Sequence, residues 1–175
     1  MKKAFFLDRD GTINQDFGFV GKKQDVVLLP GVGEAIKKIK DKGFLVIVIS
    51  NQSGVARGYF TESDVNEVNE YINHLLSDFD VKIDKFYYCP HLIGSKIEKY
   101  NCDCCCRKPK TGLFHKAIDE FDIDVKSSFA CGDKYRDVEK LEDIGFYVSH
   151  LGILDGKKAS NHYNDLLSFV NQVVW

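Results

Sequence analysis

The stretch "FLDRDGT", residues 6–12, ends an apolar run near the N-terminus and brings two carboxylates, Asp8 and Asp10, close together in the chain. Residues two apart in an extended chain project on the same side, so both carboxylates are expected to point the same way. Gly11 permits the chain to turn, and Thr12 follows with a hydroxyl. The stretch therefore predicts a strand whose end carries a pair of acidic groups.

Short apolar runs recur along the chain and predict strands over residues 4–8, 44–50, 85–89, 127–131 and 146–150. The second run is almost continuously apolar, which is typical of a strand covered on both faces. Segments with helical spacing of apolar residues lie between and after them, over 31–43, 61–79, 112–122, 135–145 and 164–174. The last is expected to pack on the sheet edge. This alternation predicts an α/β fold, a three-layer Rossmann-like parallel sheet with helices on both faces.

The whole chain, residues 1–175, is expected to form a single domain, because it shows no repeat, low-complexity tract or linker. Its net charge of −2 and scattered Lys and Arg residues argue against a nucleic-acid partner. The apolar run at 4–7 is too short for a signal peptide or a membrane span. We therefore expect a cytoplasmic protein with no membrane contact and with reduced thiols. We also expect a monomer, although the sequence leaves the oligomeric state open.

Polar residues follow the predicted strands, at the edge where parallel sheets bind ligands. They are Asp8, Asp10, Ser50, Asn51, Gln52, Asp133, Lys134 and Asp137, and Lys108 comes just before a predicted helix. Carboxylates from separate strands suit Mg²⁺, whereas a hydroxyl and a lysine suit phosphate oxygens. An Asp beside Mg²⁺ is a possible nucleophile on phosphorus, with a second carboxyl two residues on as proton donor. Each residue alone has an ordinary explanation as a turn, a cap or a solvated charge; the combination predicts a phosphoryl-transfer site.

Four motifs, "DRDGT" (8–12), Ser50, Lys108 and "GDKYRD" (132–137), resemble those of the haloacid dehalogenase superfamily of phosphatases. The resemblance implies that Asp8 is the nucleophile that forms an aspartyl-phosphate, and that Asp10 is the general acid and then the base. It also implies that Ser50 and Lys108 bind phosphate. Asp8, Asp133 and the backbone carbonyl of Asp10 would hold Mg²⁺, with Asp137 supporting them or starting a helix.

Many members of that superfamily carry a separate cap domain over the site. Here the gaps between the motifs are too short for a folded cap. The resemblance therefore implies a capless enzyme, with a rim formed by loops 14–27, 51–60 and 90–107.

The cysteine-rich loop at 89–106 has the spacing of a zinc site: Cys89-x-His91, then twelve residues, then Cys104-x-Cys106. Three thiolates and an imidazole match a closed tetrahedral structural Zn²⁺ site. Cys102 and Cys105 are extra, so Cys102 with Cys104 remains a second possible pair, and four adventitious surface thiols are the simplest explanation without a metal. Cys131 is expected to be a buried small hydrophobe.

The pattern "CPH…CxCRKP" is similar to the zinc-bearing branch that contains heptose bisphosphate phosphatases and histidinol-phosphate phosphatases. In that branch the last cysteine directly precedes Arg-Lys-Pro, which favours Cys104 and Cys106 as ligands.

Two further loops, "NQDFGFV" (14–20) and "SNQSGVARGYF" (50–60), resemble the substrate loops of the heptose bisphosphate phosphatases. The resemblance implies substrate contacts from Asp16, Phe17, Gly18, Phe19, Ser50, Asn51, Gln52, Ser53, Arg107, Lys108 and Lys134. Arg107 suits the far phosphate of a bisphosphate, because its guanidinium fork matches phosphate oxygens. Arg57 either helps Arg107 to bind that phosphate or is a solvated charge on the loop.

The function that this resemblance implies is Mg²⁺-dependent removal of the 7-phosphate from D-glycero-D-manno-heptose 1,7-bisphosphate, a phosphorylated sugar. The product would enter nucleotide-activated heptose biosynthesis for surface glycans such as lipopolysaccharide. The long stretch between His91 and Cys104 favours this substrate over histidinol phosphate, the substrate of the neighbouring enzymes in the branch. Two non-enzymatic functions also stay open: a receiver-like phospho-aspartate module and a zinc-stabilised binding module that has lost catalysis. The anomer at C1 stays open as well.

Overall fold

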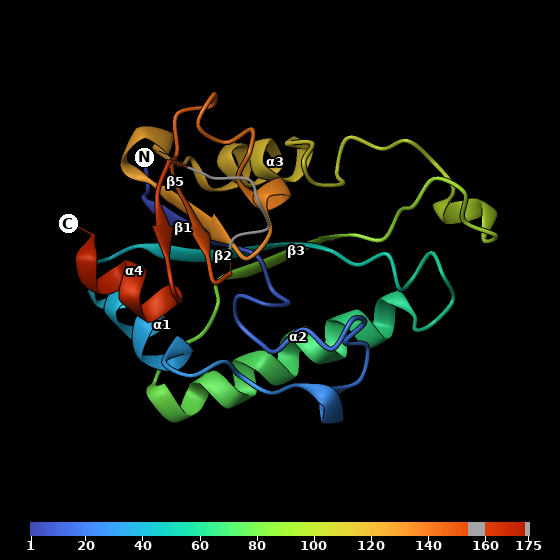
Figure 1. The fold of residues 1–175 in the computed structure, drawn as a ribbon, viewed down its shortest axis with the longest axis horizontal. Helices are drawn as coiled ribbons and strands as arrows, with labels where there is room; N and C mark the ends of the chain where they lie inside the picture. Colours follow the sequence, from blue (N-terminus) through green and yellow to red (C-terminus); the bar gives the residue numbers. More distant parts are fainter. Residues whose placement is uncertain (154–159, 174–175) are drawn as a thin grey trace.

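The structure, a computed structural model, describes residues 1–153 and 160–173. At its centre lies a parallel six-stranded sheet in the order β3-β2-β1-β4-β5-β6 (Figure 1). Its strands are β1 (Ala4–Leu7), β2 (Leu45–Asn51), β3 (Lys85–Cys89), β4 (Phe129–Gly132), β5 (Tyr147–Leu151) and β6 (His162–Tyr163). The first five correspond to the five predicted strands, whereas the short edge strand β6 was not predicted.

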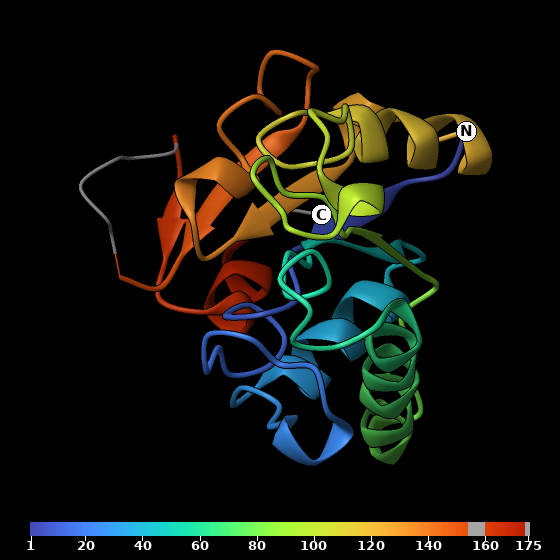
Figure 2. The same ribbon diagram turned by 90° about the vertical axis from the view of Figure 1, so that its right-hand side faces the viewer.

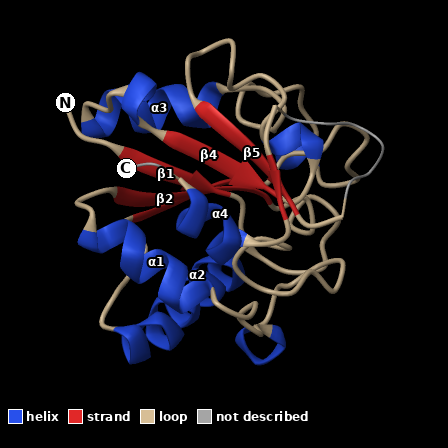
Figure 3. Ribbon diagram, turned by 60° about the vertical axis from the view of Figure 1, so that its left-hand side comes forward, coloured by secondary structure: helices blue, strands red, loops and turns tan. Residues whose placement is uncertain are grey.

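Helices cover both faces of the sheet, which confirms the predicted α/β class. They are α1 (Val32–Asp41), α2 (Glu62–Leu76), α3 (Gly112–Phe121) and α4 (Leu166–Gln172). Figure 3 shows α3 on one face and α1, α2 and α4 on the other. The side chains of successive strand residues point to opposite faces of the sheet. Phe5 packs in the core under α1, α2 and α4, and Phe6 packs in the core under α3.

Local sequence explains where helix α2 begins and where helix α1 ends. Thr61 and Asp64 form a capping box at the start of α2, in which each side chain accepts from the other residue's backbone N–H. Helix α1 ends before Gly43, whose φ of +79° lies in the left-handed region that glycine adopts without strain. Both helices turn their apolar stripe toward the sheet.

The prediction of a helix over residues 135–145 was wrong. That segment begins with a single 3-10 turn at Tyr135–Asp137 and continues as consecutive turns. Its backbone N–H groups bond mostly to the third residue back, as in Leu141 to Val138 and Ile144 to Leu141. Val138 and Leu141 are buried, so the apolar spacing that predicted a helix is satisfied by turns that fold over the α3 face.

The C-terminal helix was predicted over 164–174, of which residue 174 lies outside the described residues. As observed, α4 begins after Asp165, whose side chain accepts from the Ser168 N–H. It packs against α1 and the edge strand β6. Phe169 of α4 is fully buried against Phe5 and Phe129.

All six strands are parallel, so their carboxyl ends meet at one edge of the sheet, where the three predicted rim loops lie (Figure 2). Within the described residues these loops hold only 3-10 turns, at Lys23–Asp25 and Glu98–Tyr100, and no folded cap. The capless architecture is therefore confirmed. Among the described residues, no helix combines the length and the apolar character that crossing a bilayer requires.

Candidate active site

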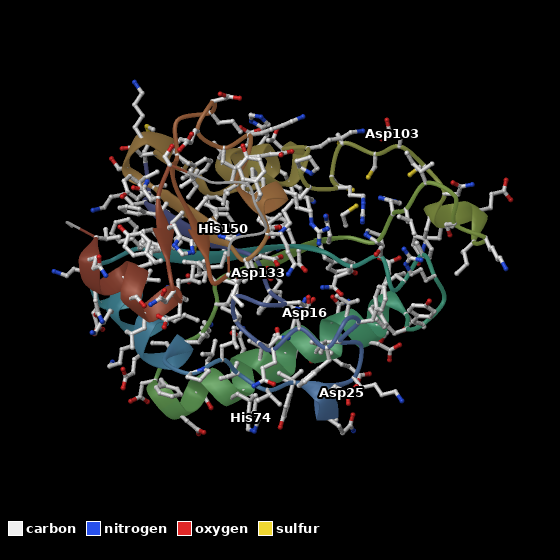
Figure 4. All side chains as sticks on the ribbon, in the orientation of Figure 1. Asp16, Asp25, His74, Asp103, Asp133 and His150 are labelled. Carbon is white, nitrogen blue, oxygen red and sulfur yellow. The ribbon has the colours of Figure 1, made fainter. Side chains whose placement is uncertain are left out.

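A cavity of about 260 Å³ opens at the carboxyl edge of the sheet, beyond β1, β2 and β4. Its lining includes the predicted residues Asp8, Asp10, Asp16, Gly18, Phe19, Ser50, Asn51, Gln52, Ser53, Arg107, Lys108, Asp133 and Lys134. Phe17 is the predicted contact that does not line it; this side chain is 63% exposed. The cavity also takes in Gly54, Arg57, Arg136 and Asp137. Figure 4 labels Asp16 and Asp133 near the middle of the molecule, where the cavity lies.

Lys108 is buried at the base of the cavity between two carboxylates. Its Nζ lies 2.6 Å from Asp8 Oδ1 and 2.7 Å from Asp137 Oδ1, and it donates to the carbonyl oxygen of Ile49 at 2.7 Å. Burial acts to lower the pKa of Lys108, but Asp137 and Asp8 outweigh it and the net shift is upward. The ammonium therefore keeps its charge at the place where phosphate oxygens are expected.

The Asp8 carboxylate is poised to change charge near neutral pH. Burial is the main effect that raises its pKa to about 7, and repulsion from Asp137 adds to it while Lys108 opposes both. A buried carboxylate with a raised pKa at the base of a cavity has the character of a catalytic group.

A candidate cation site lies beside Asp8. Oxygen atoms of Asp8, Asp133 and Asp137 lie within 4.8 Å of one another. Asp133 Oδ2 accepts from Lys134 Nζ at 2.7 Å, whereas its Oδ1 is buried without a hydrogen-bond partner. Burial also raises the pKa of Asp133. Such an orphaned oxygen among clustered carboxylates fits a hard divalent cation.

Gly11 makes this arrangement possible. Its φ is +85°, and a Cβ at this position would lie 2.3 Å from Asp133 Oδ2. Only glycine leaves room for the Asp133 carboxylate against the first loop.

The Asp10 carboxylate is held by donors on both of its oxygens. Arg9 bonds to it twice, from Nε to Oδ1 at 3.1 Å and from Nη2 to Oδ2 at 3.0 Å. Asn14 Nδ2 donates to Oδ1 at 2.9 Å, and Gln52 Nε2 donates to Oδ2 at 2.8 Å. Arg9 and Asn14 were not identified from the sequence, because nothing in "DRDGT" indicates that its arginine is buried.

Two residues that follow β2 link the motifs to one another. Gln52 Nε2 also donates to Ser50 Oγ at 2.7 Å, which joins the predicted phosphate binder to Asp10. Asn51 forms a reciprocal pair with the backbone of Lys108, donating to its carbonyl oxygen at 3.1 Å and accepting from its N–H at 3.0 Å. The sequence predicted Asn51 as a substrate contact, and this structural role was missed.

Three arginines give the mouth of the cavity positive charge. Arg107 is half-buried, and burial lowers the pKa of its guanidinium, with Arg136 and Arg57 adding to the shift. Arg57 lies over the Phe19 ring, 5.6 Å from its centroid, and Phe19 meets Tyr59 edge-on at 5.0 Å. Arg136 was not predicted, although it stands within the "GDKYRD" motif. Guanidinium groups at this mouth suit a second phosphate.

The cysteine loop gathers four potential metal ligands, those of Cys89, His91, Cys104 and Cys106, within 4.8 Å of one another. Cys106 Sγ lies 2.9 Å from Cys89 Sγ and 3.1 Å from Cys104 Sγ, and His91 Nδ1 lies 3.2 Å from Cys106 Sγ. These sulfur separations exceed the disulfide bond length of about 2.05 Å. Three thiols and an imidazole in contact fit a tetrahedral zinc site.

The structure separates the two candidate cysteine pairs. Cys102 and Cys105 are exposed and lie outside the cluster, so the ligand pair Cys102 with Cys104 is disfavoured. Burial raises the pKa of Cys89 to about 11, whereas hydrogen bonds from Cys106, Cys89 and two backbone N–H groups outweigh burial at Cys104 and lower its pKa to about 6. Figure 4 shows Asp103 on this loop, near several sulfur atoms.

Comparison with known proteins agrees with this geometry. The family model for polynucleotide kinase 3 phosphatase matches residues 3–162. A D-glycero-beta-D-manno-heptose-1,7-bisphosphate 7-phosphatase of Haemophilus ducreyi is 45% identical over 97% of this chain and 99% of its own. The enzyme of the same name from Pasteurella multocida is 41% identical over 93% and 91%.

A solved structure is similar over the same span. The D,D-heptose 1,7-bisphosphate phosphatase of B. bronchiseptica, complexed with magnesium and phosphate, superposes with a TM-score of 0.82 and 27% identity, covering 97% of both chains. The chain therefore belongs to the polynucleotide kinase 3 phosphatase family of the haloacid dehalogenase superfamily, in the branch of the heptose bisphosphate phosphatases.

Proposed function

We propose that the protein is a Mg²⁺-dependent phosphatase that removes the 7-phosphate of D-glycero-β-D-manno-heptose 1,7-bisphosphate. The observation that carries this proposal is the buried Asp8–Lys108 pair beside the orphaned oxygen of Asp133. The names of the relatives supply the substrate and its β-anomer. The product would enter the biosynthesis of nucleotide-activated heptose.

Asp8 and Asp133, with the backbone carbonyl of Asp10, would hold the Mg²⁺. When bound, the ion supplies charge neutralisation at the phosphoryl oxygens. The solved relative that is complexed with magnesium and phosphate supports Mg²⁺ as the metal.

The proposed reaction has two displacement steps at phosphorus. In the first, an Asp8 oxygen attacks the 7-phosphorus, the bond to the C7 oxygen breaks, and Asp10 donates a proton to that oxygen. In the second, Asp10 takes a proton from water, the resulting hydroxide oxygen attacks phosphorus, and the bond to Asp8 breaks to release phosphate. Lys108 and Ser50 bind the phosphoryl oxygens throughout.

The 1-phosphate would lie toward the arginines at the mouth of the cavity. Arg107 is the main candidate because it is half-buried and restrained by the protein backbone. Asp16 and Phe19 line the same cavity and are placed to contact the sugar.

The cysteine loop would bind a structural Zn²⁺ through Cys89, His91, Cys104 and Cys106. When bound, the ion would order a polar loop that has little apolar surface to bury. We also propose that the enzyme acts as a monomer. The cytoplasm keeps thiols reduced and able to bind zinc, so we propose that the protein is cytoplasmic.

A substrate panel tests the proposed function. Phosphate release is measured with the β- and α-anomers of the heptose bisphosphate and with histidinol phosphate, each with Mg²⁺ and with chelator. We expect preference for the β-anomer, no turnover with chelator, and no turnover by Asp8→Asn. Preference for histidinol phosphate would overturn the substrate assignment, and full activity of Asp8→Asn would overturn the mechanism.

A further inference from the structure

Arg9 is a cation that the fold buries almost completely. Its side chain is 1% exposed, and the carboxylate with which it pairs is that of Asp10. Removing a charge from water costs free energy, which only close hydrogen-bonding partners of opposite charge offset. The two parallel bonds from Nε and Nη2 to the two oxygens of Asp10 form the planar fork that arginine makes and lysine cannot.

The four bonds to Asp10 use the whole acceptor capacity of its carboxylate, which offers about four lone-pair directions. Oδ1 accepts from Arg9 and Asn14, and Oδ2 accepts from Arg9 and Gln52. A carboxylate so held has one orientation. To exchange a proton with a substrate it must release one donor and keep the others.

The position of the other two donors indicates which oxygen is released. Asn14 is fully buried and does not line the cavity, whereas Gln52 does line it. Oδ2, the oxygen shared with Gln52, is therefore the one on the cavity side. Gln52 also donates to Ser50 Oγ, so one amide contacts both Oδ2 of Asp10 and the proposed phosphate binder.

The rest of the Arg9 guanidinium is bonded to two other parts of the fold. Nη2 donates to the carbonyl oxygen of Val20 at 2.9 Å, and Nη1 donates to Asn69 Oδ1 on α2 at 3.3 Å. Val20 belongs to the loop that also carries Asp16 and Phe19. Arg9 thus joins the Asp10 carboxylate to the substrate loop and to a helix of the scaffold.

We propose that Arg9 is a positioning residue for proton transfer: its fork holds the Asp10 carboxylate so that Oδ2 faces the leaving oxygen of the substrate. This role rests on the proposed function, in which Asp10 is the group that protonates the leaving oxygen. It makes a prediction that separates positioning from stability. In the first step, transfer of the phosphoryl group to Asp8, only a leaving group that needs a proton depends on Asp10 and therefore on Arg9.

The experiment compares two leaving groups in the same enzyme preparation. A sugar alkoxide needs the proton from Asp10, whereas p-nitrophenolate is a stable anion and does not. The rate of the first step is measured as release of the leaving group in a single turnover with enzyme in excess. For Arg9→Met we expect this rate to fall by about 100-fold on heptose bisphosphate and by less than about fivefold on p-nitrophenyl phosphate. The enzyme concentration that gives half of the maximal rate should change little. Arg9→Lys, which keeps the charge and loses the fork, should show a smaller fall with the same selectivity.

Two controls separate the proposed role from general damage. Asn69→Ala removes the bond from Nη1 and leaves the fork intact, so its ratio of the two activities should equal that of the wild type. In an Asp10→Asn background, Arg9→Lys should produce no further change in that ratio, because the two residues act through one group.

Equal loss on both substrates would overturn the proposal, and so would an unchanged ratio in both Arg9 variants. If Arg9→Met does not fold, as judged by thermal unfolding, Arg9→Lys carries the test. If the wild type does not hydrolyse heptose bisphosphate, the proposed function fails, and any alkyl phosphate that it does hydrolyse gives the same comparison for Arg9.

Discussion

Arg107 donates from Nη1 to the carbonyl oxygen of His91 at 3.2 Å, so an arginine of the cavity is held by the backbone of a residue in the Cys/His cluster. Cys106, another member of that cluster, directly precedes Arg107 in the chain. A metal bound there would restrain the arginine from both sides. Zinc in this protein would therefore act on substrate binding through geometry, without taking part in the chemistry.

Loss of one cluster cysteine is expected to weaken substrate binding more than catalysis. For Cys106→Ser we expect KM for the bisphosphate to rise by about tenfold or more, a smaller fall in kcat, and loss of bound zinc. Steady-state kinetics and elemental analysis of the purified protein measure these effects. The adjacent Cys105→Ser is the matched control, because Cys105 is exposed and outside the cluster. Zinc lost in Cys105→Ser and retained in Cys106→Ser would refute the ligand assignment.

The reciprocal pair between Asn51 and the Lys108 backbone should matter for activity as well as stability. Removing both hydrogen bonds in Asn51→Ala is expected to cost about 1–3 kcal/mol of unfolding free energy. It should also lower kcat by about tenfold, because a displacement of about 1 Å at a catalytic group has effects of this order or more. Denaturant unfolding and phosphate release measure the two effects.

Asn73 offers a matched control for that substitution. Its side chain makes the same two-way pair with the backbone of Ile83, at 2.8 and 3.2 Å, and it does not line the active-site cavity. Asn73→Ala should therefore lose a similar amount of stability with unchanged kcat. Equal loss of activity in both variants would contradict the positioning role of Asn51.

The raised pKa of Asp8 predicts a pH dependence in the metal-free protein. Burial, with Asp137, raises this pKa from 3.8 to about 7 against the opposing effect of Lys108. Between those values the folded state holds a proton that the unfolded chain has lost. The Asp8 contribution to stability is therefore lost as the pH rises through this window, and levels off above it.

Mg²⁺ should reverse this trend, since it binds the ionised carboxylate. We expect the gain in melting temperature on adding Mg²⁺ to grow from about pH 5.5 to about pH 7 and then level off. Thermal unfolding with Mg²⁺ and with chelator across this range measures it. Asp8→Asn should show a smaller increase with pH, because only Asp133 then remains as a ligand with a raised pKa. A gain that shrinks with rising pH in the wild type would argue against Asp8 as a ligand.

Gly11→Ala is expected to damage the cation site specifically. The positive φ costs about 1 kcal/mol for alanine, and the new Cβ would collide with the Asp133 carboxylate. Gly43→Ala is the control, since Gly43 has a φ of +79° and a Cβ added there would meet no heavy atom within 4 Å. Both variants should lose similar backbone stability, but only Gly11→Ala should need more Mg²⁺ for half-maximal activity. An identical Mg²⁺ requirement would refute this role.

Much of the site was predictable because its residues follow strands or stand in compact motifs. Asp8, Ser50 and Asp133 come at or just after the ends of β1, β2 and β4, and parallel strands bring such ends together. Lys108 was identified from its motif. That these residues share one edge depends on the strands being parallel, which the alternation of apolar runs and helical segments indicates.

Other features of the structure depend on contacts that the local sequence pattern does not predict. Arg9 stands in a motif of charged residues, and only the packing of Val20 and Asn69 around it shows that it is buried. The segment 135–145 has helical apolar spacing, yet the Asp137 side chain bonds to Lys108 and to the Lys134 N–H, and the chain continues in turns. In both cases distant partners outweigh local preference.

The sequence by itself determined the α/β class, the capless architecture and the choice of Asp8 as the candidate nucleophile, because hydrophobic periodicity and motif spacing are local properties of the chain. Only the tertiary structure decided that Cys104 and Cys106, rather than Cys102, meet Cys89 and His91, and that Arg9 holds Asp10. These choices require side chains distant in sequence, or loops without regular structure, to converge in space. Burial and hydrogen bonding fix such convergence when the whole chain packs.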